Sequence, residues 1–163
     1  MGIGTKEKAM SVSSDGQLCY GIKLDEDISL PWGNDIEHWW IHEINGYANP
    51  FELFDENDEW IGGERAPQHK IDEYYNTRRE FDSQHPLPVE LVNYCSYDYP
   101  MWIAAIPSTV LSCRRGYPKG FSPTQMEWDR NQPFVTAPLL HFVEKYISPI
   151  HEEPKWWLSS LYG

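Results

Sequence analysis

The chain has 163 residues, of which 40% are hydrophobic and 23% charged, and its 25 acids outnumber its 13 bases to give a formal net charge of −12. This length and composition are typical of one globular domain and argue against a disordered or collagen-like chain. The acidity argues against a basic nucleic-acid binder, and the longest apolar run, at residues 101–106, is too short to span a bilayer.

The first half of the chain predicts one strand followed by two helices. Alternating apolar residues at 17–24 are typical of a strand. Residues 35–45 carry apolar side chains at helical spacing, with Asn34 as a predicted N-cap and Gly46 as a predicted C-terminal stop. A second helix is predicted at 68–82 by the same spacing.

The second half predicts a hairpin and a long loop. The segments 89–95 and 101–106 are rich in strand-forming residues and are separated by a turn, so we expect them to pair. Residues 109–115 fit either a strand or a short helix. Prolines and glycines predict a loop over 117–133.

A third helix at 137–147 and a final strand at 155–162 complete the predicted elements. Their order predicts an α+β fold in which a mostly antiparallel sheet of about four or five strands packs with three helices. We expect one domain over residues 1–163. The adjacent Trp156 and Trp157 must then face opposite sides of the sheet, so at least one is exposed or covered by a second layer.

All of the net charge comes from an acidic segment at residues 25–64, which has no Lys or Arg. The rest of the chain has equal numbers of acids and bases. The acids of the segment are Asp25, Glu26, Asp27, Asp35, Glu37, Glu43, Glu52, Asp55, Glu56, Asp58, Glu59 and Glu64. The segment also holds seven aromatic residues, Trp32, Trp39, Trp40, Tyr47, Phe51, Phe54 and Trp60.

This acidic segment has two interpretations. It is either a solvated face whose aromatic residues point into the core, or a surface that binds a basic partner. Segments that only solvate a protein are poor in aromatic residues, so the composition favours an interface. The predicted partner-binding residues are Glu52, Asp55, Glu56, Asp58 and Glu59 for steering, with Phe54 and Trp60 as anchors.

Mimicry of DNA by this segment is at most partial. Duplex DNA carries one charge per about 1.7 Å of its axis. Forty residues of helix would span about 60 Å, so twelve acids give about one charge per 5 Å. An acidic and aromatic protein interface needs no such charge density.

His38 and His42 are four residues apart, which is a spacing that can place two imidazoles on one metal ion. A third ligand would have to come from His69, His85 or a cysteine through folding. The sequence between the two histidines lacks the glutamate of a metalloprotease motif, and exposure on a polar helix face is the simpler explanation. A small metal-dependent hydrolase or nuclease is therefore an alternative function.

The three cysteines and the single basic cluster offer weaker candidates. Cys19 and Cys95 lie in predicted strands and are interpreted as core residues, whereas Cys113 precedes two arginines that would lower its pKa if it were exposed. The basic cluster at residues 114–120 places bases next to an aromatic residue and could hold phosphate, but in so acidic a chain we interpret it as an internal counter-charge for the acidic segment. Few cysteines, no glycosylation acceptor and no apolar leader in the first ten residues favour a reducing cytoplasm.

Three stretches are similar to small uncharacterised proteins encoded in bacteriophages and prophages. They are MSVSSDGQLCYGI at residues 10–22, HPLPVELVNYCSYDYPMW at 85–102 and PKWWLSSLYG at 154–163. No activity and no site residues are attached to that family. The resemblance implies an accessory phage protein that acts in the bacterial cytoplasm, and by analogy an inhibitor of restriction, CRISPR or other host machinery.

The predicted function is therefore a non-enzymatic phage protein that binds and inhibits a basic, nucleic-acid-handling host protein. We expect no cofactor, no direct binding to nucleic acid or membrane, and a possible homo-oligomer. A minor virion or assembly component, with self-association through the tryptophan-rich ends, is a second alternative.

Overall fold

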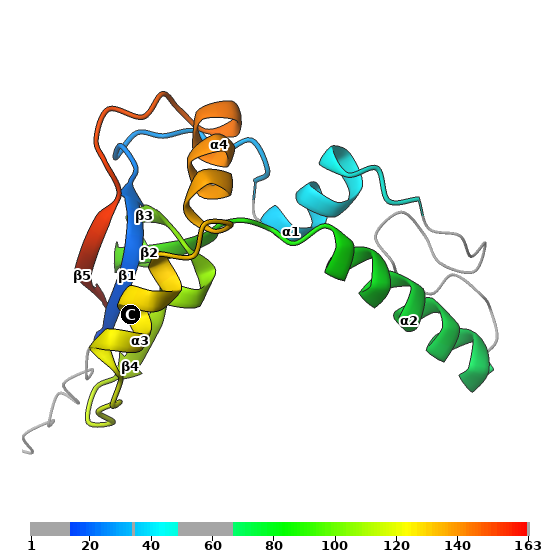
Figure 1. The fold of residues 1–163 in the computed structure, drawn as a ribbon, viewed down its shortest axis with the longest axis horizontal. Coiled ribbons are helices and arrows are strands. Elements are labelled where there is room, and N and C mark those ends of the chain that lie inside the picture. The colour runs from blue at the N-terminus through cyan, green and yellow to red at the C-terminus, as the bar shows by residue number, and fades with distance from the viewer. Residues whose placement is uncertain (1–13, 34, 49–66, 163) are drawn as a thin grey trace, which may run out of the picture. The chain divides into compact units, whose positions relative to one another are not determined.

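A computed structural model describes residues 14–33, 35–48 and 67–162 (Figure 1). The chain divides into two compact units, which we describe separately. The sheet unit comprises Met1–Ser29 and Pro88–Gly163, and the helical unit comprises Leu30–Leu87. The expectation of one domain over residues 1–163 stays a prediction.

The sheet unit contains five strands, and it confirms the predicted α+β fold with a mostly antiparallel sheet. The strands are β1 (Ser14–Lys23), β2 (Glu90–Ser96), β3 (Pro100–Ala105), β4 (Leu111–Arg114) and β5 (Lys155–Tyr162). Their order is β3-β2-β5-β1-β4, and all neighbours are antiparallel except β2 and β5. The predicted hairpin forms between β2 and β3.

The sheet also closes on itself, which the sequence did not predict. The last residues of β1 pair with β3, from Gly21 opposite Ala105 to Lys23 opposite Ile103, whereas its first residues pair with β4. A short 3-10 helix, η2 (Pro107–Thr109), connects β3 to β4. The enclosed core consists of buried Cys19, Val92, Ile103 and Ala105.

Thr109 holds this connection in place from a fully buried position. Its Oγ1 accepts a hydrogen bond from the Tyr20 backbone N–H at 3.0 Å and donates one to the Ile106 carbonyl at 2.7 Å. One buried hydroxyl therefore joins a backbone donor of β1 to the backbone carbonyl that precedes η2.

Two helices pack on the outer face of the sheet, α3 (Pro123–Arg130) and α4 (Thr136–Tyr146). Helix α3 lies within the segment that we predicted to be a loop, so that prediction is wrong. Its N-terminus is stabilised by Ser122, whose hydroxyl accepts from the Gln125 N–H at 3.3 Å, and by Pro123 in the first turn. The described residues thus hold four α-helices where three were predicted.

The two adjacent tryptophans of β5 face opposite sides of the sheet, and each is half-buried. On the outside, the indole N–H of Trp156 donates to Glu127 of α3 at 2.8 Å. On the inside, Trp157 packs against the enclosed core and donates to the Gly21 carbonyl at 3.0 Å. Both faces at this point are therefore covered.

The helical unit contains α1 (Ile36–His38), the π-helix η1 (Trp39–Ile44) and α2 (Gln68–Gln84), close to the two predicted helices. Asp35 caps α1 by accepting from the His38 N–H at 2.9 Å; the predicted cap, Asn34, lies outside the described residues. The π-helix ends where the Asn45 amide side chain donates to the Trp40 carbonyl at 2.7 Å. Gly46 follows with a φ of 69°, as its predicted role requires.

Candidate functional site

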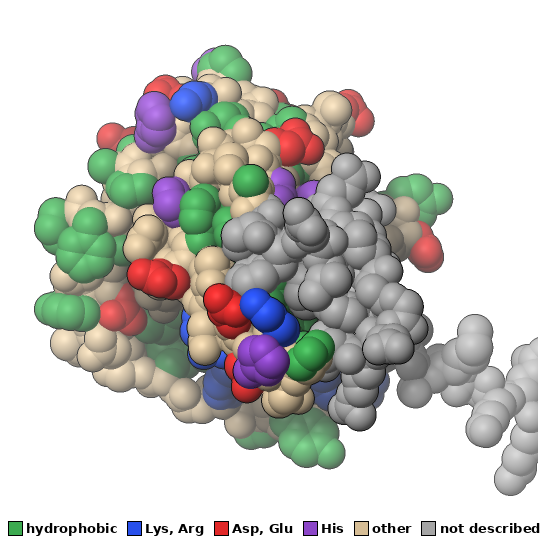
Figure 2. All heavy atoms as spheres, turned by 90° about the vertical axis from the view of Figure 1, so that its right-hand side faces the viewer, with side chains coloured by type: hydrophobic (Ala, Val, Ile, Leu, Met, Phe, Trp, Pro, Cys, Tyr) green, Lys and Arg blue, Asp and Glu red, His purple; other side chains and the backbone are tan. Residues whose placement is uncertain are grey.

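The predicted partner-binding residues Glu52, Phe54, Asp55, Glu56, Asp58, Glu59 and Trp60 all lie outside the described residues. Six other acids of the acidic segment are described, and all six are exposed: Asp25, Glu26, Asp27, Asp35, Glu37 and Glu43. None of the six forms an ion pair with another described residue. On the face that Figure 2 shows, acidic side chains are scattered over the coloured part of the surface.

Three of the four described aromatic residues of the acidic segment belong to the core of the helical unit, whereas the fourth, Trp40, is half-buried. Trp32, Trp39 and Tyr47 are buried. The rings of Trp32 and Trp39 lie 5.1 Å apart between centroids, and Tyr47 lies 4.8 Å from Phe81. For these residues, aromatic content therefore reflects core packing, as the solvated-face interpretation expects.

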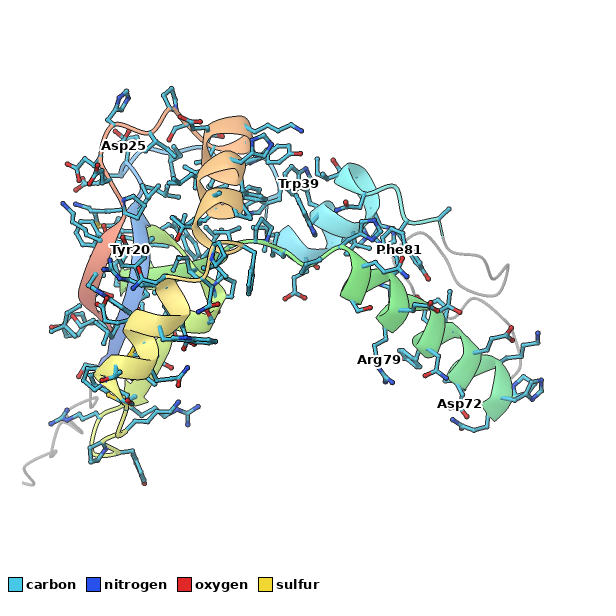
Figure 3. The ribbon with its side chains drawn as sticks, viewed as in Figure 1. Tyr20, Asp25, Trp39, Asp72, Arg79 and Phe81 are labelled. Atoms are coloured by element: carbon cyan, nitrogen blue, oxygen red, sulfur yellow. The ribbon has the colours of Figure 1, made fainter. Side chains whose placement is uncertain are left out.

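The sheet unit carries a cavity of about 320 Å³ where β1 ends and where residues 148–152 lead towards β5. Apolar side chains form about half of its lining, and charged or polar side chains form the rest. The apolar residues are Ile22, Leu24, Val143, Pro149 and Ile150, and the charged residues are Lys23, Asp25, Glu26 and Glu152. Figure 3 shows Asp25 beyond the end of β1, with Tyr20 further back along the strand.

The cavity is acidic, because three carboxylates and one ammonium group line it beside His151. Glu152 forms an exposed ion pair with Lys155 at 3.1 Å, whereas Asp25 and Glu26 form none with described residues. An apolar wall below a carboxylate rim matches a long cationic side chain, which buries its carbon stem and keeps its charge near water. Sequence reasoning missed this site because Glu152 lies more than a hundred residues from Asp25.

The two histidines of the metal-site alternative lie together, with ring centroids 4.3 Å apart. His42 Nδ1 is 3.1 Å from the Tyr47 carbonyl oxygen, which can only accept, so Nδ1 carries the proton. His42 Nε2 is 3.4 Å from Arg78 Nη1, which can only donate. The lone pair that a metal would need is thus directed at Arg78.

No third ligand accompanies these histidines among the described residues, which contain no group of three or more His, Cys, Asp or Glu placed to hold a metal ion. His85 instead directs Nδ1 at the Phe81 carbonyl at 3.0 Å. The described geometry therefore gives no support to a metal-dependent hydrolase or nuclease.

The cysteines differ from their predicted placement in one case. Cys19 is fully buried, as predicted, and its burial, together with the charge of Glu90, raises the pKa of the thiol to about 11. Such a thiol stays protonated near neutral pH and is a poor nucleophile. Cys95 is exposed, so its prediction as a core residue is wrong; its φ of 75° turns the backbone near the end of β2. Cys113 is half-buried.

The basic cluster lies at the other end of the sheet unit from the acidic cavity. Arg114 is opposite Asp15, at the start of β1, whereas Asp25 follows the end of that strand (Figure 1). Among the described residues, neither Arg114 nor Lys119 forms an ion pair. Six acids of the acidic segment lie outside the described residues, so the interpretation of the basic cluster as their counter-charge stays a prediction.

Comparisons of the chain with protein-family models, with curated proteins and with solved structures found no match. Among the described residues, no helix is both long and apolar enough to cross a membrane.

Proposed function

We propose that the protein acts by binding a basic protein partner, and that the acidic cavity at the end of β1 receives a Lys or Arg side chain of that partner. The observation that carries this proposal is the pairing of an apolar wall with Asp25 and Glu26, whose carboxylates form no ion pair with described residues. Both residues belong to the acidic segment that the sequence predicts to be an interface.

The partner we propose is a host protein that handles nucleic acid, such as a restriction or CRISPR component. Such proteins present basic surfaces to phosphate groups, and an acidic protein can occupy those surfaces. The resemblance to phage and prophage proteins supports an inhibitor that acts in the bacterial cytoplasm. Glu52, Asp55, Glu56, Asp58 and Glu59 would steer the encounter, with Phe54 and Trp60 as anchors.

Attraction between exposed carboxylates and a basic partner depends strongly on salt. Exposed carboxylates steer a basic partner over distances near the Debye length, which is about 10 Å at 0.1 M salt and about 3 Å at 1 M. We therefore expect the association rate and the affinity to fall as salt is added. Apolar contacts between the cavity wall and the stem of the bound side chain would persist.

The cavity can be tested directly with hexa-arginine as a probe. We expect the peptide to shift the backbone NMR signals of residues 23–26 and 148–152 in a saturable, salt-sensitive way. The double variant Asp25→Lys/Glu26→Lys should lose this response. The control Glu80→Lys/Glu144→Lys, which changes net charge equally at exposed helix positions, should keep it.

Two results would contradict a cavity for cationic side chains. One is a set of shifts that avoids the cavity, and the other is equal binding by the two double variants. In either case, the acidic residues would act only through the net charge of the protein.

A further inference from the structure

The end of the sheet unit that carries the basic cluster also exposes five aromatic rings. Tyr97, Tyr99, Tyr117, Phe121 and Tyr162 are each between 50% and 78% exposed. None of the five rings packs against another ring in the described part of the chain. Exposed aromatic residues in this number at one end of a small sheet are unusual, because burial of their rings is favourable.

Strand register brings these residues to one end. Ser96 pairs with Tyr162, so Tyr97 and Tyr99 in the β2–β3 turn follow directly beside the last residue of β5. Tyr162 pairs with Ser14, and Asp15 pairs with Arg114, after which Tyr117 and Phe121 follow in the β4–α3 loop. The surface thus spans β2, β5, β1 and β4, or about 15 Å at the usual strand spacing.

The turns that hold these rings are ordered by specific contacts. The Tyr99 N–H donates to the Ser96 hydroxyl at 3.2 Å, and the Tyr117 N–H donates to the Arg114 carbonyl at 2.9 Å. Gly116 has a φ of 81°, which a residue with a side chain rarely adopts. The loop therefore turns back at a defined point and keeps Tyr117 near Arg114.

Positive charge accompanies the rings. Arg114, Arg115 and Lys119 lie in a stretch, residues 99–126, that contains no acid. Among the described residues, two acids share this end of the unit, Asp15 and Asp98. The acidic cavity lies beyond the far end of β1. Its Glu26 is still close enough to β2 that, after burial, its charge helps to raise the pKa of Tyr94, so Glu26 opposes an anion on the β2 side of the surface more than on the β4 side, where the cations lie.

We propose that this end of the sheet unit binds single-stranded nucleic acid. The tyrosine and phenylalanine rings would stack on bases, and Arg114, Arg115 and Lys119 would contact phosphates. A duplex keeps its bases stacked inside and cannot use the rings. An acidic peptide could use the cations, but its carboxylates would be repelled by the negative faces of the rings. The expectation that the chain does not bind nucleic acid rested on the net charge of the whole chain, whereas residues 99–126 carry three bases and no acid.

This inference does not depend on the proposed function, because the acidic cavity and the basic end lie at opposite ends of β1. It can be tested on the full chain by fluorescence anisotropy with labelled dT12, rU12 and a 12-base-pair duplex. We expect saturable binding of a single strand at 50 mM salt and much weaker binding of the duplex. The ratio between dT12 and rU12 affinities assigns the preferred strand to DNA or RNA.

Substitutions can test the contributions of the cations and of the aromatic rings to binding separately. Arg114→Ser/Lys119→Ser should weaken binding and reduce the slope of log K against log salt by about 1.4, since each phosphate contact on a single strand contributes about 0.7. The control Lys70→Ser/Arg79→Ser removes the same charge from exposed positions on α2 and should leave the slope unchanged. Tyr117→Leu and Phe121→Leu should each weaken binding by at least about fivefold. Asp98→Asn should strengthen it.

Several outcomes would overturn the proposal. These are no binding of either single strand, equal affinity for the duplex, or equal losses in the Arg114→Ser/Lys119→Ser variant and its α2 control. A salt-sensitive dimer that the Arg114→Ser/Lys119→Ser variant abolishes, without any binding of oligonucleotide, would show that the surface receives a second copy of the chain instead.

Discussion

Replacing Gly21 by alanine tests whether the sheet closes through β1 and β3. A Cβ atom at Gly21 would lie 2.1 Å from the Ala104 carbonyl oxygen and 2.6 Å from Ala105 Cα. Both contacts are with backbone, which cannot rotate away as a side chain can. The strands would have to separate by about 1 Å or more to restore ordinary contact distances near 3.5 Å.

The cost of that separation follows from what the closure contains. Three residue pairs join β1 to β3, and Gly21 also accepts the indole N–H of Trp157. If each pair carries about one hydrogen bond worth about 1 kcal/mol net, loss of the closure costs about 3 kcal/mol. Disturbed packing around Cys19 and Ile103 would add to this.

Gly16 provides the matched control on the same strand. A Cβ atom there would lie 3.4 Å from the Cys113 sulfur, which is ordinary contact. We expect Gly16→Ala to change stability by less than about 1 kcal/mol. Urea unfolding followed by circular dichroism would measure both variants. A Gly21→Ala midpoint equal to that of Gly16→Ala would refute a sheet closed at this point.

Three further predictions concern buried groups. Thr109→Val should lower the free energy of unfolding by about 1–3 kcal/mol, because it leaves the Tyr20 N–H without this acceptor. The control Thr124→Val, at an exposed position, should change it by less than about 0.5 kcal/mol. Equal effects of the two substitutions in urea unfolding would argue against the buried hydroxyl contact. In a thiol-reagent assay, Cys95 should react in the folded protein and Cys19 only after unfolding, and early loss of all three thiols would contradict the enclosed core. The pKa of Cys19 is raised to about 11, so between about pH 9 and 11 the unfolded chain loses a proton that the folded chain keeps. The free energy of unfolding should therefore fall as the pH rises through that window, and it should fall less in Cys19→Ala. The same dependence of the free energy of unfolding on pH in both proteins would contradict a buried neutral thiol.

Local patterns predicted the individual elements of this fold well. The strand predicted at residues 155–162 coincides with β5, and the helix predicted at residues 137–147 comes within one residue of α4 at both ends. Helix α3 was missed although Ser122 and Pro123 form a recognisable helix start, because the surrounding prolines and glycines outweighed them. The capping residues alone would have been enough to predict this helix.

Long-range features were beyond sequence reasoning. Closure of the sheet depends on Gly21 meeting Ala105, and no local pattern indicates a pairing between residues 84 positions apart. The same holds for the cavity that joins Asp25 to Glu152. The aromatic residues of the acidic segment show a different limit, since Trp39 and Tyr47 look identical in sequence whether they anchor a partner or fill a core.

The central claim is that acidic residues at the end of β1 and in the acidic segment capture a basic host protein. The most direct measurement is a comparative pulldown from bacterial lysate, read by mass spectrometry at low and moderate salt. The baits are the native protein, Asp25→Lys/Glu26→Lys, a fourfold lysine variant of Asp55, Glu56, Asp58 and Glu59, and the Glu80→Lys/Glu144→Lys control. We predict one stoichiometric, salt-sensitive basic partner that the native protein and the control retain and both acidic-site variants lose. A partner that all four baits retain, or no partner for the native protein in lysates that carry restriction and CRISPR systems, would contradict the claim.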